Sequence, residues 1–322
     1  MKHLVALLLS IGPLWGIAQA TPTLLTVLYA DGPIQYRASA REPWQVLAGP
    51  ISRLKLQSTY EAKLSKDAIL VLASDGATPI TLRHQAGIAR LADWIRQPAT
   101  DEVARAMNTY FATFWQALTN AAVEVEAYAS DLVGRKGRRS RGDGCTTPLM
   151  LSPDYDAAIA GDSAIRFSWK RASQTALYTL AFYDNYDEKA NLLYQIDVAD
   201  TTLLVVPNKP FLERGVVYYW SVFPKGTPNC ARYTFTLAKT EAFRQVETEA
   251  AQLMAQLGSD AALSAFLSAA LYERNHFFPE AHRAYLQAHR LSPKNTLYRD
   301  GLALFLARRG LPEQASQLYT QR

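Results

Sequence analysis

The chain of 322 residues has few of the residues from which metal and nucleophilic sites are built, with two cysteines and five histidines. It contains no His-Glu-x-x-His, no pair of Cys-x-x-Cys motifs, no Gly-x-Ser-x-Gly elbow and no glycine-rich phosphate loop. The common zinc, serine-hydrolase and nucleotide-binding motifs are therefore missing. We expect a protein that is not an enzyme and that holds no metal and no cofactor. An enzyme whose site is assembled from scattered residues stays an alternative.

Long hydrophobic runs are also missing after the first twenty residues, so no later segment is expected to cross a membrane. Residues 1–20 themselves combine Lys2, a short apolar stretch and small residues at Ala18 and Ala20. This order is typical of a cleavable signal peptide. We expect cleavage before Thr21 and an exported protein, either periplasmic or secreted and associated with the surface of a bacterium.

The net charge of +5 comes largely from one place in the chain. Loss of Lys2 from the 34 basic residues leaves 33, against 29 acidic residues. Five of these 33 lie within residues 134–144, and without them the mature chain would carry 28 basic residues. Because the basicity is local, nucleic acid is not an expected partner. The segment is rich in glycine, which predicts an exposed linker, and contact with a phosphate-bearing envelope polymer is the alternative.

Residues 21–98 show short apolar runs separated by Gly, Pro and Asp turns, which predicts a small β domain. The pattern is carried by Val27, Gly32, Ile34, Trp44, Leu47, Gly49, Ala68, Leu70, Leu72, Asp75, Gly76, Ile80 and Leu82. It resembles the FecR-like β modules of bacterial envelope proteins. The resemblance implies an all-β module and says little about what it binds.

From residue 99 to 133 the apolar period becomes helical, with Val103, Met107, Tyr110 and Phe111 on one face. The polar face is acidic, and Arg105 is its clear cation. A helix that lies on a membrane surface is usually rich in Lys and Arg. We therefore expect this helix to pack on a neighbouring domain.

Residues 145–238 return to strands, at a spacing of about ten residues that is typical of a sandwich. The candidate strands are 165–169, 177–183, 192–198, 202–206, 216–222 and 233–237. With Phe167-Ser168-Trp169 and Tyr218-Tyr219-Trp220, the segment resembles a fibronectin type III or Ig-like module. Cys145 and Cys230 bracket this unit. In an exported protein, an even number of cysteines is compatible with a disulfide, so we predict this pair, with two unpaired thiols as the alternative.

Residues 240–322 are helical, and a comparison of the segment with itself at a spacing of 34 residues aligns Ala269 with Ala303 and Ala281 with Ala315. These intervals resemble tetratricopeptide (TPR) repeats. In that family the inner helix of each hairpin lines a concave groove. Carried over by repeat position, the resemblance implies that a partner would contact Leu263, Phe266, Glu273, Arg274, Asp300, Leu304 and Arg308.

The sequence thus predicts a multidomain α+β protein with two small all-β modules, a helical segment and an all-α repeat. The expected function is that of an exported adaptor or scaffold that binds a protein or peptide partner. Among the groove residues we expect Phe266, Glu273, Arg274, Asp300 and Arg308 to carry the binding. The alternative function is binding of cell-envelope glycan or peptidoglycan by the β modules, through Trp44 or another exposed aromatic side chain.

Overall fold

A computed structural model describes most of the chain after the predicted signal peptide. Thr21, Cys145, Cys230 and the basic segment 134–144 lie outside the described residues, so the cleavage site, the disulfide and the linker stay predictions. The described residues are 22–47, 54–74, 78–83, 87–98, 100–119, 125–126, 148–154, 156–160, 164–172, 175–186, 190–207, 210–229, 231–257 and 260–320.

The N-terminal β unit (residues 22–98) contains two four-stranded sheets, in the orders β4-β1-β6-β7 and β3-β2-β5-β8. All its strand pairs are antiparallel. Its elements are β1 Leu24–Asp31, β2 Ile34–Arg37, β3 Gln45–Val46, β4 Lys55–Gln57, β5 Glu61–Leu64, β6 Ile69–Ser74, β7 Ile80–Arg83, β8 Gly87–Arg90 and α1 Leu91–Ile95.

The sheet that contains β1 and β6 is buried on both faces. Leu70 and Leu72 point into the core of the N-terminal β unit, whereas Ile69 and Val71 belong to a second apolar cluster outside it. Side chains alternate between the faces of a strand, so a strand buried on both faces is an uninterrupted apolar run. The run that the sequence shows at 68–72 therefore marks a sheet that is covered by another element.

The covering element is α2 (Glu102–Thr119). The helix begins after Asp101, whose Oδ1 accepts a hydrogen bond from the Ala104 backbone at 3.0 Å, a usual N-cap arrangement. Its apolar side chains Val103, Met107, Tyr110 and Phe111 are buried. The prediction that this helix packs on a neighbouring domain is confirmed, and it packs on two: β7 on one side and α4, α5 and α7 on the other.

The second β unit (residues 148–238) has a five-stranded sheet, β10-β16-β15-β12-β13, facing a three-stranded sheet, β14-β11-β9. The β10–β16 pair is parallel and the other pairs are antiparallel. Its strands are β9 Met150–Ser152, β10 Ala157–Ile159, β11 Ile165–Trp169, β12 Tyr178–Tyr183, β13 Leu192–Val198, β14 Thr202–Val205, β15 Val217–Pro224 and β16 Tyr233–Leu237.

Aromatic rings fill the space between these two sheets. Phe167 of β11 meets Phe182, Trp220 and Phe235 of the opposite sheet at ring-centroid distances of 5.0, 5.1 and 5.5 Å. All three contacts are edge-to-face, the arrangement that aromatic pairs favour. The core of the second β unit is therefore built largely of aromatic rings.

The helical unit (residues 240–320) follows directly from β16. Asp260 caps α5 and Asn295 caps α7, each by accepting a hydrogen bond from a backbone amide of its helix. The helices of this unit are α4 Thr240–Leu257, α5 Ala261–Arg274, α6 Phe278–Leu291, α7 Thr296–Arg308 and α8 Pro312–Thr320.

The 34-residue register of the sequence is visible in the backbone of the two helix hairpins. Ala281 and Ala315, at equivalent positions, are both fully buried. His276 and Gly310, also 34 residues apart, follow α5 and α7 with φ angles of 65° and 76°. Because only glycine adopts this left-handed region without cost, His276 is strained where its repeat partner is not.

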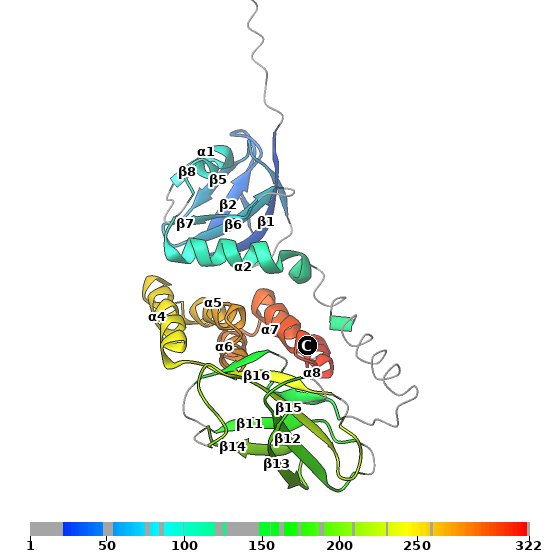
Figure 1. The fold of residues 1–322 in the computed structure, drawn as a ribbon. Helices are drawn as coiled ribbons and strands as arrows, with labels where there is room; N and C mark the ends of the chain where they lie inside the picture. Colours follow the sequence, from blue (N-terminus) through cyan, green and yellow to red (C-terminus); the bar gives the residue numbers. More distant parts are fainter. Residues whose placement is uncertain are drawn as a thin grey trace, which may run out of the picture.

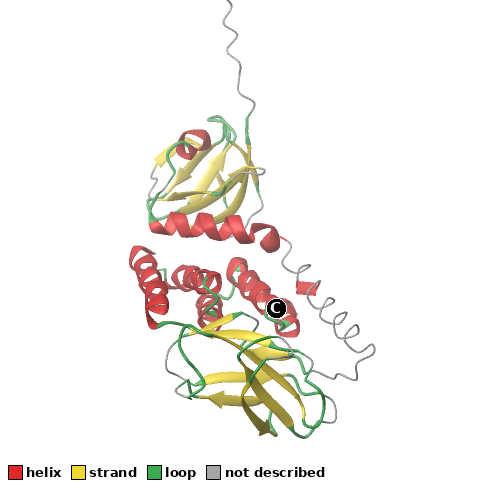
Figure 2. Cartoon of the chain, viewed as in Figure 1, coloured by secondary structure: helices red, strands yellow, loops and turns green. Residues whose placement is uncertain are grey.

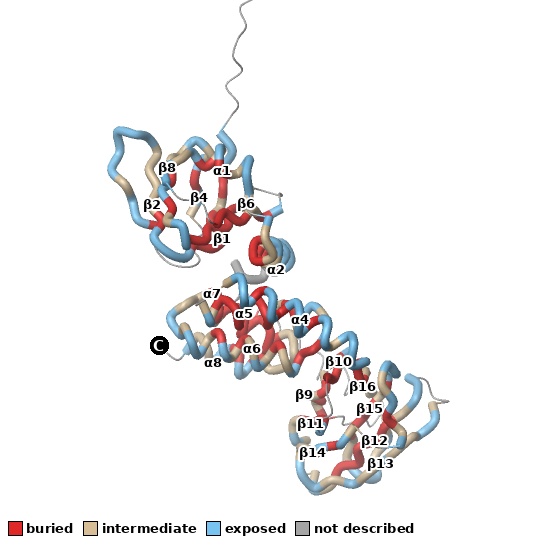
Figure 3. Tube along the Cα trace, turned by 90° about the vertical axis from the view of Figure 1, so that its left-hand side faces the viewer, coloured by how far each residue is buried: buried red, intermediate tan, exposed pale blue. Residues whose placement is uncertain are grey.

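The last unit in the sequence lies in the middle of the molecule. Figures 1 and 3 show the helical unit between the N-terminal β unit with α2 and the second β unit, and Figure 2 shows its helices between the two groups of strands. Hydrogen bonds join it to both neighbours, from Arg83 to the Gln256 carbonyl at 3.4 Å and from the Ala158 amide to the His276 carbonyl at 2.9 Å. At this level the predicted α+β class is confirmed. Within the described residues, none of the helices combines the length and apolar character needed to cross a bilayer.

Candidate binding groove

Four of the five residues predicted to contact a partner are buried or nearly so. Phe266, Glu273 and Asp300 are buried, and the Arg308 side chain is only 17% exposed. Arg274 is different, with 53% of its side chain exposed. Leu263 and Leu304, assigned to the same groove, are also buried. Phe266 is covered because Tyr110 of α2 packs on its ring, whereas Glu273 and Arg274 line the open cavity described below. That these residues contact a partner stays a prediction.

Close packing holds α2 against this face. The Tyr110 ring meets the Phe266 ring edge-on at 4.7 Å, and Phe111 lies 6.2 Å from Tyr29 of β1. Gly301 of α7 makes the approach possible. A Cβ at this position would lie 2.7 Å from Phe266 Cε2 and 3.2 Å from the Tyr110 hydroxyl oxygen. The helix α2 therefore packs between the N-terminal β unit and the helical unit and joins them.

A buried polar network lies beneath α2. The Arg308 guanidinium contacts Glu273 Oε1 at 2.6 Å, and the Tyr285 hydroxyl donates a hydrogen bond to Glu273 Oε2 at 2.9 Å. Burial raises the pKa of Tyr285 and of Tyr110 well above the usual range, so both phenols stay neutral. Removing one partner of such a pair leaves a buried charge without compensation. Arg308→Glu would place two carboxylates together in this buried site, so it is expected to destabilise the helical unit rather than to alter binding alone.

The open cavity lies beside this contact, between α2, α4 and α5, with a volume of about 690 Å³. Its walls come from three helix faces whose residues recur at intervals of three and four, with apolar side chains such as Leu253 and Leu267 among them. We call it the α2–α5 groove. It is lined by Glu102, Arg105, Ala106, Thr109, Tyr110, Thr113, Glu249, Leu253, Leu267, Ala270, Leu271, Glu273, Arg274, His276, Phe278 and Arg309.

Two ion pairs flank the groove, one exposed and the other partly exposed. Arg274 of α5 contacts Glu249 of α4 at 3.2 Å, and their side chains are 53% and 48% exposed. Arg105 of α2 lies 4.0 Å from Glu102 and donates a hydrogen bond to the Thr100 carbonyl at 2.9 Å. Exposed pairs contribute only about 0–1 kcal/mol each. Charges of a ligand can therefore replace these partners at little cost.

The second β unit closes one end of the groove. Arg309 contacts Asp154 at 3.0 Å, and its guanidinium lies 3.9 Å from the centre of the Phe278 ring. His276 Nδ1 lies 3.1 Å from the carbonyl oxygen and 3.3 Å from the carboxylate of Asp156. Asp156, like His276, has a left-handed backbone, with φ of 64°. Two strained residues in contact fix the loop of the second β unit against the groove.

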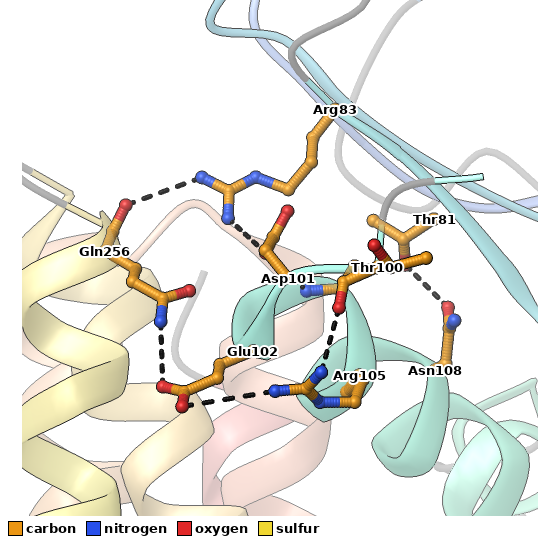
Figure 4. A network of polar contacts seen from close by, with 9 residues as sticks. Thr81, Arg83, Thr100, Asp101, Glu102, Arg105, Asn108 and Gln256 are labelled. Carbon is orange, nitrogen blue, oxygen red and sulfur yellow. Dashed lines mark hydrogen bonds and ion pairs between the residues drawn. The ribbon is translucent and has the colours of Figure 1, made fainter. Parts of the chain in front are cut away.

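Polar contacts tie the N-terminal β unit to the first turns of α2, as Figure 4 shows. Arg83 of β7 is 7% exposed and contacts Asp101 at 2.7 Å, so the N-cap of α2 is itself held by the sheet. Gln256 of α4 donates a hydrogen bond to Glu102 at 2.8 Å, and Thr81 donates one to Asn108 at 2.7 Å. The first turns of α2 are thus tied to both units.

The part that α2 plays in the groove was not predicted from the sequence. Arg105, Ala106, Thr109 and Thr113 lie at helical spacing, but they belong to the face that the sequence marks as polar and solvent-facing. The small side chains of Ala106, Thr109 and Thr113 were the available signal, because small residues along a helix leave room for another chain. Among the described residues, no group of three His, Cys, Asp or Glu side chains is placed to hold a metal ion.

The groove can thus hold a ligand by apolar contact and by ion-pair exchange. Neither the known protein families nor the characterised proteins with which the chain was compared match it.

Proposed function

We propose that the protein is a non-enzymatic adaptor that binds a peptide segment of a protein partner in the α2–α5 groove. The observation that carries the proposal is the composition of the groove. It combines an apolar floor at Leu253, Leu267 and Leu271 with the ion pairs Arg274–Glu249 and Arg105–Glu102. A chain with alternating apolar and charged side chains complements this surface, whereas a small nonpolar ligand would leave the charges unused.

The size of the groove supports a segment rather than a folded domain as the ligand. A helix about 10 Å wide occupies roughly 420 Å³ per turn, so the volume of 690 Å³ holds about one and a half turns. An extended segment of a few residues also fits. The walls belong to units that hold one another in place, so the site is largely formed before the ligand arrives, which lowers the entropic cost of binding.

We also propose the finer identity of the three units, namely FecR-like, fibronectin type III or Ig-like, and TPR-like. The two small sheets of the first unit, the aromatic core between the sheets of the second and the 34-residue register of the helix hairpins support these assignments. Export to the bacterial envelope remains part of the proposal and rests on the pattern of residues 1–20.

The sharpest test places the photo-crosslinking residue benzoylphenylalanine at Thr109 of α2 or at Ala270 of α5, both of which line the groove. A matched control carries it at Gln252, an exposed residue of α4 that does not line the groove. Irradiated source cells should give the same discrete crosslinked partner from both groove positions and none from the control. The proposal would be contradicted if the partner crosslinked only to position 252, or if neither groove position gave a crosslinked product.

Two variants then separate binding from folding. Ala270→Trp fills the groove, and Arg274→Glu places a second carboxylate beside that of Glu249. Neither substitution changes a fully buried position. Both should keep the thermal midpoint of the wild type and lose the crosslinked product from Thr109. Deletion of residues 240–322 is not a clean test. It would uncover the buried face of α2 and the surface of the second β unit that contacts His276.

A further inference from the structure

A second surface lies on the outer face of the five-stranded sheet, among residues that do not line the α2–α5 groove. Phe182 of β12 and Trp220 of β15 point into the core. Because side chains alternate between the faces of a strand, their neighbours Tyr183 and Tyr219 point outward. The strand register places them directly opposite each other, with Leu192 of β13 opposite Tyr183 and Thr234 of β16 opposite Tyr219. Thr234 is only 7% exposed, so the row presents a leucine and two half-buried tyrosines across three strands.

The row extends into an exposed aromatic surface. Tyr186, which follows β12, is 63% exposed, and its ring lies 6.0 Å from that of Tyr219. Leu192 and Val217, on the same face, are 49% and 45% exposed. Outer sheet faces are usually polar, and contiguous exposed apolar side chains commonly mark binding sites. We call Tyr183, Tyr186 and Tyr219 the tyrosine platform.

Polar groups hold the platform in place. The Arg232 guanidinium stacks on the Tyr183 ring at 3.9 Å and donates hydrogen bonds to the carbonyls of Asn185 and Tyr186 at 3.1 and 2.9 Å. Asn229 donates a hydrogen bond to the Tyr183 hydroxyl at 3.0 Å. The loop that carries Tyr186 is thus fixed although its side chain is exposed. An exposed ring that is already ordered loses little entropy when a ligand binds.

We propose that the tyrosine platform is a binding site for a neutral polysaccharide. A pyranose ring has an apolar face of C–H groups, which packs on the electron-rich face of a tyrosine, and an edge of hydroxyls, which hydrogen-bond to planar polar groups. Asp184 and Asn191, which bond to each other at 2.7 Å, offer such groups beside the platform. The carboxylate of Asp184 and the guanidinium of Arg232 balance in charge, which favours an uncharged ligand over a polyanion.

The length of the row favours a chain of sugars over a single one. Neighbouring strands lie about 4.8 Å apart, so Leu192 and Tyr219 are separated by about 10 Å across the sheet. Trp44, the aromatic residue singled out in the sequence, is a weaker candidate. Its ring lies in the N-terminal β unit, outside this row. There the Arg37 guanidinium stacks on it at 4.3 Å, much as Arg232 stacks on Tyr183, so the ring faces open to a sugar are those of Tyr186 and Tyr219.

The test is co-sedimentation of the full-length protein with three insoluble polysaccharides: purified peptidoglycan sacculi, chitin and cellulose. The wild type should sediment with at least one of them, and binding to sacculi alone would identify peptidoglycan as the source of the sugar chain. Tyr186→Ala and Tyr219→Ala should weaken binding about tenfold each, as expected for loss of one aromatic contact. Tyr186→Trp should retain binding.

The matched control is Leu204→Ala, which removes a side chain that is 58% exposed on β14 of the opposite sheet. It should bind as the wild type does. Three results would overturn the proposal: no sedimentation of the wild type with any of the three polysaccharides, wild-type binding by Tyr186→Ala, or equal loss with Leu204→Ala. None of these outcomes bears on the α2–α5 groove, because the platform belongs to the second β unit.

Discussion

Gly301→Ala offers a direct measurement of how tightly α2 is packed on the helical unit. Helix propensity alone predicts that the substitution stabilises α7 by about 1 kcal/mol, because glycine is a poor residue in a helix interior. The structure predicts the opposite sign. The new Cβ would lie 2.7 Å from Phe266 Cε2 and 3.2 Å from the Tyr110 hydroxyl oxygen, so the ring or α2 itself must move.

Overpacking of this kind costs typically about 1–3 kcal/mol, so the net change in the free energy of unfolding should be a loss of about 0–2 kcal/mol. Urea unfolding followed by tryptophan fluorescence measures this change. Hydrogen exchange should show the loss locally, as faster exchange of the Tyr110 and Phe111 amides, while the core strands of the second β unit are unaffected.

The double variant Gly301→Ala/Phe266→Leu is the control. Leucine lacks the ring atoms that the new methyl group meets, so the two changes together should cost less than the sum of the single changes. A stabilisation of about 1 kcal/mol by Gly301→Ala alone would refute the reasoning, since it would mean that propensity dominates and that α2 does not press on α7.

Three further predictions concern the packing and the charges around α2. Arg308→Met leaves the buried Glu273 carboxylate unpaired and should destabilise the protein by about 3–5 kcal/mol in urea unfolding, and Glu273→Leu added to it should recover much of the loss. Ala281→Leu overpacks a fully buried contact and should cost about 1–3 kcal/mol, with the two β units still folded by near-UV circular dichroism. Burial and the neighbouring Asp260 raise the pKa of Asp31 from 3.8. Its protonated form is therefore the one that the fold favours, and the resulting stability is lost as the pH rises through the raised value. The thermal midpoint of Asp31→Asn should accordingly equal that of the wild type near pH 3.5 and exceed it at pH 7. A difference between the two midpoints that does not change with pH would contradict this.

Much of the secondary structure could be predicted from the sequence, because it depends on local periodicity. In the second β unit, the predicted strands 165–169, 192–198 and 233–237 match β11, β13 and β16 residue for residue. These strands alternate aromatic or branched side chains that fill the core on one face. The short strands β9 and β10 were missed, since three residues are too few to show a period.

The binding site could not be predicted in the same way. The repeat register placed Phe266, Glu273, Asp300 and Arg308 on the inner face of the helical unit, and they do lie where α5 and α7 meet α2. Nothing in the local pattern could show that the apolar face of α2, some 150 residues earlier, would cover them. Apolar residues at helical spacing specify that a face will be buried, but they do not specify which surface will bury it.

The sequence by itself therefore determined most of the longer elements, their buried faces and the repeat spacing, since these follow from the periods of the strand and the helix. Tertiary structure alone decided that the last unit in the chain lies between the two others, that α2 takes the place of a partner, and that the open groove lies to one side of it. It also brought Tyr186 beside Tyr219, two residues 33 positions apart, on the face of one sheet. The physical reason is that the hydrophobic effect is non-directional, so many pairings of apolar faces would bury the same area. Only close packing, such as that of Gly301 against Phe266, selects one of these pairings.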